Sequence, residues 1–131
     1  MLQDPPPDAF VRLRGNKYTT TIYCIVSGII KLSKVTPLPP ARVVYRGLHG
    51  LEMPSKFVSQ DDYGVSGGVE LGMLSTSQDM KVAVQYAGKG LLPTVFEISC
   101  GAVDRGASLT FLSQYPGEEE MLYPPLSYLE L

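Results

Sequence analysis

The sequence has few of the residues on which common catalytic and metal sites depend. Among its 131 residues there is one histidine, His49, and there are two cysteines, Cys24 and Cys100, far apart and each in an apolar context. A lone loop histidine without a serine or cysteine nucleophile motif does not indicate a catalytic triad, so we assign His49 no role. The two cysteines indicate free, buried thiols in a reducing compartment, so we expect neither a disulfide nor a metal site.

Charge and long apolar runs are also scarce. The formal net charge is -2, and the basic residues near the start, Arg12, Arg14 and Lys17, are too few to form a basic patch. No apolar run approaches the roughly 20 residues of a membrane-spanning helix, and the start does not resemble a secretory signal. We therefore expect a cytoplasmic protein that has neither a nucleic acid nor a membrane as its partner. We also expect a monomer.

The composition that remains is that of one globular domain. Hydrophobic residues make up 44% of the chain and charged residues 18%, and a chain of this length buries about two-thirds of its unfolded surface. Because Pro5-Pro6-Pro7 cannot enter a helix or a central strand, we expect residues 1–15 to form an extended lead-in and residues 16–131 a single domain.

A helix is predicted over residues 16–34. Its apolar positions step by three or four residues, the spacing of one helix face, and Asn16 is the expected N-cap. Three consecutive threonines and the later isoleucines favour a strand instead, but the length of the pattern favours the helix. The apolar positions are Tyr18, Ile22, Ile25, Ile29 and Leu32.

Two short strands follow, each ending in polar residues. Residues 41–46 predict a strand that ends at Arg46 and is closed by Gly47. An arginine beside a glycine suits a phosphate clamp, although most such arginines lie in water at a strand end. Residues 69–74 predict a second strand, at whose end Ser75 could donate to a carboxylate of a neighbouring strand.

A second helix and a further strand are predicted after Ser75-Thr76-Ser77. The helix covers residues 78–88, with Ser77 as N-cap, Asp79 in the first turn and Gly88 just beyond the end. Tyr86 would project from it toward the end of the preceding strand. Residues 94–99 alternate in polarity and predict a strand.

The stretch from Ser113 to Pro125 contains three consecutive glutamates. Pro116-Gly117 fits a type II turn that leads into a strand near Glu118, so that Glu118 and Glu120 would share one face. A solvated acidic turn is the common alternative for such a run. The apolar residues that follow, 121–123, favour a functional site.

In order and flanking sequence, three of these features resemble the Arg-Ser-Glu class of mono-ADP-ribosyltransferases. They are Arg46 in Val-Tyr-Arg-Gly, the Ser75-Thr76-Ser77 motif, and Glu118-x-Glu120. The resemblance covers nearly the whole chain after residue 15. It implies an α+β fold, a split β-sandwich of two packed sheets with an N-terminal helix, a short helix after the Ser-Thr-Ser strand, and a cleft that takes NAD.

The resemblance also implies a role for each candidate site residue. Arg46 would bind the NAD diphosphate, the Gly47 backbone the nicotinamide amide, and Thr76 and Ser77 would join Ser75 in binding NAD. Ser75 would orient Glu120, which would contact the nicotinamide ribose and stabilise its developing positive charge. Tyr86 would stack on nicotinamide, Glu118 would deprotonate or orient an arginine, and Tyr115 would meet the target protein.

This chemistry suits a site without a catalytic histidine. Opening the bond to nicotinamide builds positive charge on the ribose, which a carboxylate stabilises, and nicotinamide departs neutral without a general acid. The resemblance thus implies an enzyme that transfers ADP-ribose from NAD to a target protein with an accessible arginine. The alternatives are an NAD glycohydrolase and a non-catalytic module that binds a nucleotide or a partner in the same cleft.

Overall fold

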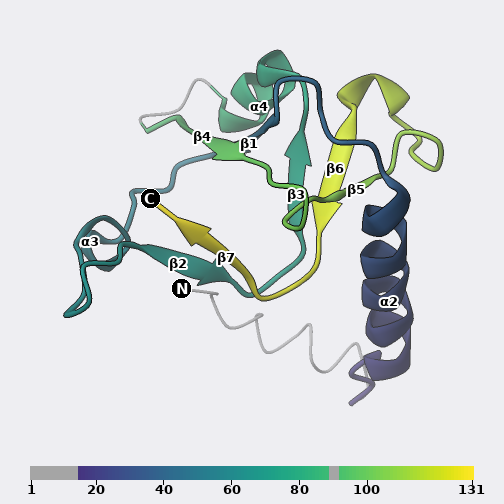
Figure 1. Ribbon diagram of the computed structural model, residues 1–131, viewed down its shortest axis with the longest axis horizontal. Coiled ribbons are helices and arrows are strands. Elements are labelled where there is room, and N and C mark those ends of the chain that lie inside the picture. Colours follow the sequence, from purple (N-terminus) through teal and green to yellow (C-terminus); the bar gives the residue numbers. More distant parts are fainter. Residues whose placement is uncertain (1–14, 89–91) are drawn as a thin grey trace.

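The computed structural model describes residues 15–88 and 92–131, and the chain forms two antiparallel sheets with helices around them (Figure 1). The strands are β1 (Val43–Leu48), β2 (Gly67–Glu70), β3 (Leu74–Ser77), β4 (Thr94–Ser99), β5 (Ala107–Ser108), β6 (Glu120–Tyr123) and β7 (Ser127–Glu130). The helices are α2 (Thr19–Val35), α3 (Ser55–Val58), α4 (Met80–Ala87) and the 3₁₀ turn η1 (Pro116–Glu118). The large sheet has the order β4-β1-β3-β6-β5, and β2 pairs with β7 in a small sheet.

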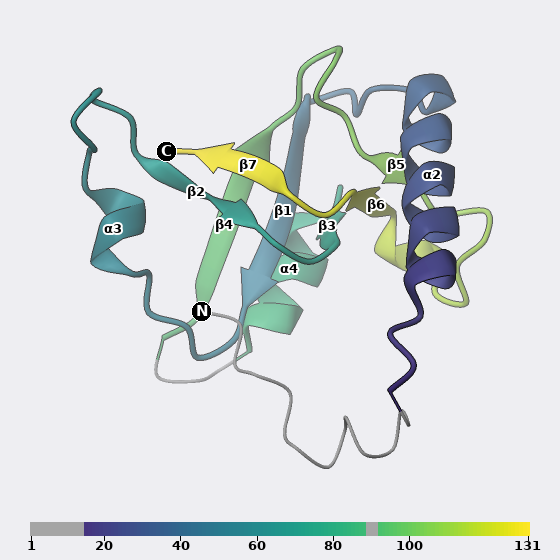
Figure 2. The ribbon, with the colours of Figure 1, turned by 90° about the horizontal axis from the view of Figure 1, so that it is seen from below.

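Helix α2 stands at one edge of the large sheet, beside β5 and β6 (Figure 2). It confirms the predicted helix, but the N-cap is wrong: Tyr18 takes the cap position, and Asn16 accepts a hydrogen bond from the Tyr18 N–H. The C-terminal end of the helix is fixed by Thr36, whose carbonyl accepts from Arg105 and whose hydroxyl accepts from the Ser108 N–H. The helix is therefore attached to the sheet through its last turn.

The large sheet is nearly split between β1 and β3. Strand β1 pairs with β4 from Val43↔Ser99 to Leu48↔Thr94, and β3 pairs with β6 along its whole length, but β1 and β3 meet at only one pair, Tyr45↔Ser77. On either side of this pair the two strands are not hydrogen-bonded to each other, as expected for a split β-sandwich.

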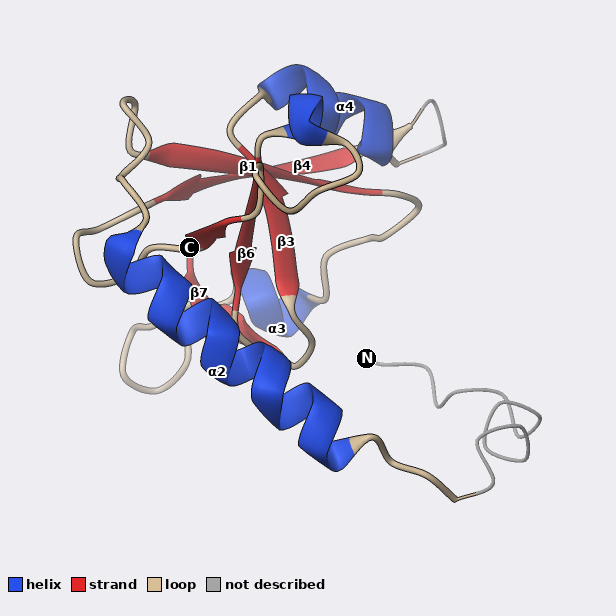
Figure 3. Cartoon of the chain, turned by 90° about the vertical axis from the view of Figure 1, so that its right-hand side faces the viewer, coloured by secondary structure: helices blue, strands red, loops and turns tan. Residues whose placement is uncertain are grey.

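The core lies between the two sheets and is built mainly from the large one. Its fully buried side chains are Val44, Leu74 and Met121, with Cys100 and Tyr123 packed against them. The small sheet adds Leu129 from β7 to this cluster. Helix α4 packs on the opposite side of β1 (Figure 3). Two packed sheets, an N-terminal helix and a short helix after β3 confirm the predicted α+β split sandwich.

Two predicted elements have different bounds in the structure. The strand expected at residues 69–74 is wrong, because β2 ends at Glu70 and a new strand, β3, begins at Leu74. Ser75, Thr76 and Ser77 therefore lie within a strand and not after one. The N-cap of α4 is Asp79, whose side chain accepts from the Lys81 N–H, and not Ser77.

The acidic stretch and one cysteine also depart from the predictions. Pro116-Gly117 forms a 3₁₀ turn and not a type II turn, and the following strand begins at Glu120 and not near Glu118. The Cys24 thiol is exposed, whereas Cys100 is buried, and both are free. The predicted lead-in, apart from Gly15, lies outside the described residues. No helix in the described part of the chain is long and apolar enough to cross a membrane.

Candidate active site

Strand β3 presents hydroxyl groups to β6 and to the 3₁₀ turn η1 that precedes it. Its alternation places Leu74 and Thr76 on the core side and Ser75 and Ser77 on the other. Thr76 is buried, and its hydroxyl donates to the Met121 carbonyl at 2.7 Å, so this side chain serves the β3–β6 contact although the residue lines the site. The two serines are left to interact with the acidic stretch.

Ser75 and Glu120 form the closest side-chain contact of the site. The pairing of β3 with β6 sets Ser77 opposite Glu120 and Ser75 opposite Leu122, so Ser75 and Glu120 are diagonal neighbours. The Ser75 hydroxyl donates to Glu120 Oε1 at 2.6 Å. A short hydrogen bond of this kind to a carboxylate is charge-assisted, and it fixes the direction of the acid.

Glu118 reaches the same site from η1 and not from a strand. The Ser77 hydroxyl donates to the Glu118 carbonyl at 2.6 Å and accepts from the Asp79 N–H at 2.9 Å, so one serine ties η1 to the start of α4. Glu119, in the left-handed region at φ 47°, is exposed. This single left-handed residue turns the chain between the two glutamates that face the site.

Tyr86 of α4 contacts Glu118 directly. Its hydroxyl donates to Glu118 Oε1 at 2.9 Å. This hydrogen bond, with the negative charge of the same carboxylate, raises the pKa of Tyr86 above its usual value. The phenol therefore stays protonated and remains a donor to Glu118 at neutral pH.

These side chains surround one cleft of about 280 Å³ next to the place where β1 and β3 separate. The structure brings together eight of the nine predicted site residues in it, and Tyr115 is not among its lining residues. The lining residues are Tyr45, Arg46, Gly47, Ser75, Thr76, Ser77, Val82, Ala83, Tyr86, Glu118 and Glu120. Tyr115 lies one residue before η1 with its side chain 66% exposed.

Gly47 allows helix α4 to approach the cleft. A Cβ atom at this position would lie 1.8 Å from the Ala83 carbonyl oxygen and 2.6 Å from the Ala87 nitrogen. No side chain fits in that space, so glycine lets α4 pack directly on β1 and bring Tyr86 to the site. The lone histidine, His49, has a structural contact nearby, between its Nδ1 and the Ala87 carbonyl at 3.1 Å.

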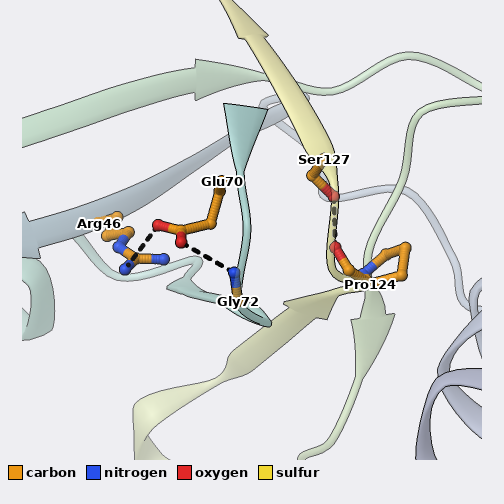
Figure 4. A network of polar contacts seen from close by, with 5 residues as sticks. All are labelled: Arg46, Glu70, Gly72, Pro124 and Ser127. Carbon is orange, nitrogen blue, oxygen red and sulfur yellow. Dashed lines mark hydrogen bonds and ion pairs between the residues drawn. The ribbon is translucent and has the colours of Figure 1, made fainter. Parts of the chain in front are cut away.

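Arg46 has a partner that the sequence did not indicate. Its Nη2 lies 3.2 Å from Oε2 of Glu70, at the end of β2, and Glu70 Oε1 accepts from the Gly72 N–H at 3.1 Å (Figure 4). Glu70 stands in a glycine-rich stretch with no motif around it, and only the fold brings its side chain to Arg46.

The other end of the Arg46 guanidinium, at Nη1, does not take part in the contact with Glu70. Nη1 is buried and has no hydrogen-bond partner within the described residues. A buried N–H without an acceptor is costly, so an anion at this nitrogen would be stabilising. The site thus fits a phosphate-bearing ligand. Among residues 15–88 and 92–131, no three His, Cys, Asp or Glu side chains are grouped to hold a metal ion.

The fold is similar to that of a solved ADP-ribosyltransferase. The structure resembles the solved ADP-ribosyltransferase HopU1 of Pseudomonas syringae pv. Tomato DC3000, with a TM-score of 0.69 and 26% sequence identity. The match covers 99% of this chain and 53% of that one, so the chain spans about half the length of HopU1. No family model matches the sequence, and no curated protein matches it.

Proposed function

We propose that this chain is a mono-ADP-ribosyltransferase that transfers ADP-ribose from NAD to arginine on a protein and releases nicotinamide. The observation that carries the proposal is the 2.6 Å hydrogen bond between Ser75 and Glu120, in the same cleft as Arg46. A guanidinium, a hydroxyl and a carboxylate from three strands meet there. The resemblance to HopU1 supports ADP-ribosylation as the general reaction.

Each group has a distinct part in the proposed reaction. Arg46 would bind the diphosphate through Nη1, which has no partner in the described part of the chain. The Gly47 backbone would hold the nicotinamide amide, and NAD would supply the ADP-ribosyl group. Glu120, oriented by Ser75, would stabilise the positive charge that develops on the ribose as the bond to nicotinamide opens. Nicotinamide departs neutral, so the step needs no proton donor.

Glu118 would act on the acceptor side of the cleft. Its carboxylate is held by the Tyr86 hydroxyl and its carbonyl by the Ser77 hydroxyl, so the group is fixed at the edge of the same cavity. A carboxylate there can attract a guanidinium and accept a proton from it as the new bond forms. This placement supports arginine as the acceptor, with exposed Tyr115 meeting the target protein.

The test measures the fate of labelled NAD with and without agmatine or poly-arginine. We expect Glu120→Gln to lower both transfer and hydrolysis by several hundredfold, about 3–4 kcal/mol of transition-state stabilisation. Glu118→Gln should lower transfer by about 10²-fold or more, as for loss of a general base, and spare hydrolysis.

Glu119→Gln is the matched control, because Glu119 is exposed between the two other glutamates. It removes the same charge and should change neither activity. Release of free ADP-ribose without labelled arginine would identify a glycohydrolase, and no NAD consumption would identify a non-catalytic module. Equal loss of transfer and hydrolysis in Glu118→Gln would remove the acceptor role of Glu118.

A further inference from the structure

The carboxylate of Glu70 is held rigidly although it lies at a strand end. Its backbone carbonyl accepts from the Leu126 N–H at 2.8 Å, at the turn between β6 and β7, and Oε1 accepts from the Gly72 N–H. That turn carries its own hydrogen bond, from the Ser127 hydroxyl to the Pro124 carbonyl (Figure 4). Oε2 is therefore presented to Arg46 from a fixed position.

This contact is the only ion pair within the described residues. The side chains of Arg46 and Glu70 are 23% and 29% exposed, so the pair is largely withdrawn from water. A guanidinium offers five N–H donors in one plane. Glu70 engages Nη2, whereas Nη1 is buried and has no acceptor among residues 15–88 and 92–131, so the two ends of the guanidinium have different surroundings.

We propose that Glu70 is a positioning residue that holds Arg46 ready for the diphosphate of a dinucleotide. The inference rests on the proposed function and assigns a role to a residue outside the sequence motif. Glu70 touches Arg46 and not the ligand, so it acts on affinity for the diphosphate and not on the step at the ribose.

Two effects of Glu70 oppose each other at an anion site. Its negative charge repels a phosphate, but the positively charged guanidinium stands between the two anions and offsets the repulsion. Its contact also orders a long side chain that would otherwise lose much rotamer freedom on binding. We expect the ordering to outweigh the repulsion, so that loss of Glu70 weakens binding.

The experiment is calorimetric titration with ADP-ribose, which has the diphosphate and lacks nicotinamide. We expect Glu70→Gln and Glu70→Ala to raise the dissociation constant about tenfold, as for loss of a charge-assisted contact. Inhibition of NAD hydrolysis by nicotinamide should stay within twofold of the wild type, because that ring does not reach the phosphate side. The kcat for NAD should also be unchanged while KM rises.

Two further variants separate positioning from other effects. Glu97→Gln removes an exposed carboxylate from the neighbouring strand β4 and should leave ADP-ribose binding unchanged. In an Arg46→Lys background, Glu70→Gln should weaken ADP-ribose binding no further, because its effect passes through the guanidinium. Melting temperatures of all variants report whether the fold is retained.

Unchanged or tighter ADP-ribose binding by Glu70→Gln would overturn the inference and leave the proposed function intact if the wild type transfers ADP-ribose. Equal weakening of ADP-ribose and nicotinamide would indicate a distorted cleft and would also overturn it. A wild-type protein that neither binds ADP-ribose nor consumes NAD would remove the proposed function, and this inference with it.

Discussion

Tyr86 meets the cleft through its hydroxyl as well as its ring. The sequence resemblance implies that the ring stacks on nicotinamide, and the structure adds a 2.9 Å hydrogen bond from the hydroxyl to Glu118. The two contacts serve different parts of the proposed reaction. The ring would contact the nicotinamide of NAD, whereas the hydroxyl contacts Glu118, the carboxylate proposed to act on the acceptor arginine. Substitutions can separate them.

Tyr86→Phe keeps the ring and removes the donor to Glu118. We expect it to lower arginine transfer about tenfold, since one hydrogen bond to a charged group is lost, and to leave NAD hydrolysis within twofold. Tyr86→Ala should lower both. Steady-state assays with labelled NAD and agmatine measure the two activities.

Tyr45→Phe is the control for this prediction, because Tyr45 also lines the cleft and its hydroxyl makes no side-chain hydrogen bond within the described residues. It should change neither activity. Equal effects of Tyr86→Phe on transfer and hydrolysis would show that the hydroxyl does not act through Glu118.

At the scale of residues, the sequence predicted which side chains meet better than how they are held. Ser75 with Glu120 could be predicted, because a motif specifies both residue types and their order. The contacts of Ser77 with the Glu118 carbonyl and of Glu70 with Arg46 could not. Both depend on how η1 and the small sheet approach the large sheet, and that approach leaves no periodic pattern in the sequence.

At the scale of elements, the packing of α4 on β1 through Gly47 decides whether the cleft forms. We expect Gly47→Ala to destabilise the protein by about 1–3 kcal/mol or more, because the added methyl group would overlap backbone atoms of α4. Chemical denaturation measures the free energy of unfolding. Activity should fall as well, since Tyr86 would move away with the helix.

Gly28→Ala is the matched control. Gly28 lies inside α2, and a Cβ there would meet nothing within 4 Å. Because alanine is about 1 kcal/mol more favourable than glycine in a helix, this variant should be more stable than the wild type. Destabilisation by Gly28→Ala, or a neutral Gly47→Ala, would contradict the assignment of a special packing role to Gly47.

The elements that were predicted correctly have a strong local signal. Strand β4 alternates in polarity, and α4 is followed directly by Gly88, whose positive φ of 71° suits glycine. The errors have tertiary causes. Residues 69–74 look like one strand, but β2 pairs with β7 and β3 with β6, so the chain must leave one sheet and enter the other between Glu70 and Leu74.

At the scale of the whole molecule, the two sheets differ in how well they are buried. The large sheet supplies Val44, Leu74 and Met121, which are fully buried, whereas every residue of β2 and β7 is at least partly exposed. We expect amides of β2 and β7 to exchange with solvent faster than those of β1, β3 and β6, because local opening of the small sheet exposes less apolar surface. Hydrogen exchange followed by mass spectrometry measures this.

The same hydrogen-exchange measurement can be made with and without bound ADP-ribose. If Glu70 links the small sheet to the diphosphate through Arg46, exchange in β2 should slow when ADP-ribose is bound, and it should not slow in Glu70→Ala. Equal protection of the two sheets without a ligand would contradict the proposed difference in stability.

The two glutamates of the cleft, Glu118 and Glu120, lie on different kinds of backbone, a 3₁₀ turn and a strand. The position of Glu120 is fixed by the register of β6 against β3, whereas Glu118 lies in the short turn η1, which follows a loop. Insertions or deletions within residues 109–117 would change the reach of Glu118 and leave Glu120 where it is. On the proposed assignment, descendants of such a protein could acquire new targets by altering loop length while their donor chemistry is inherited intact.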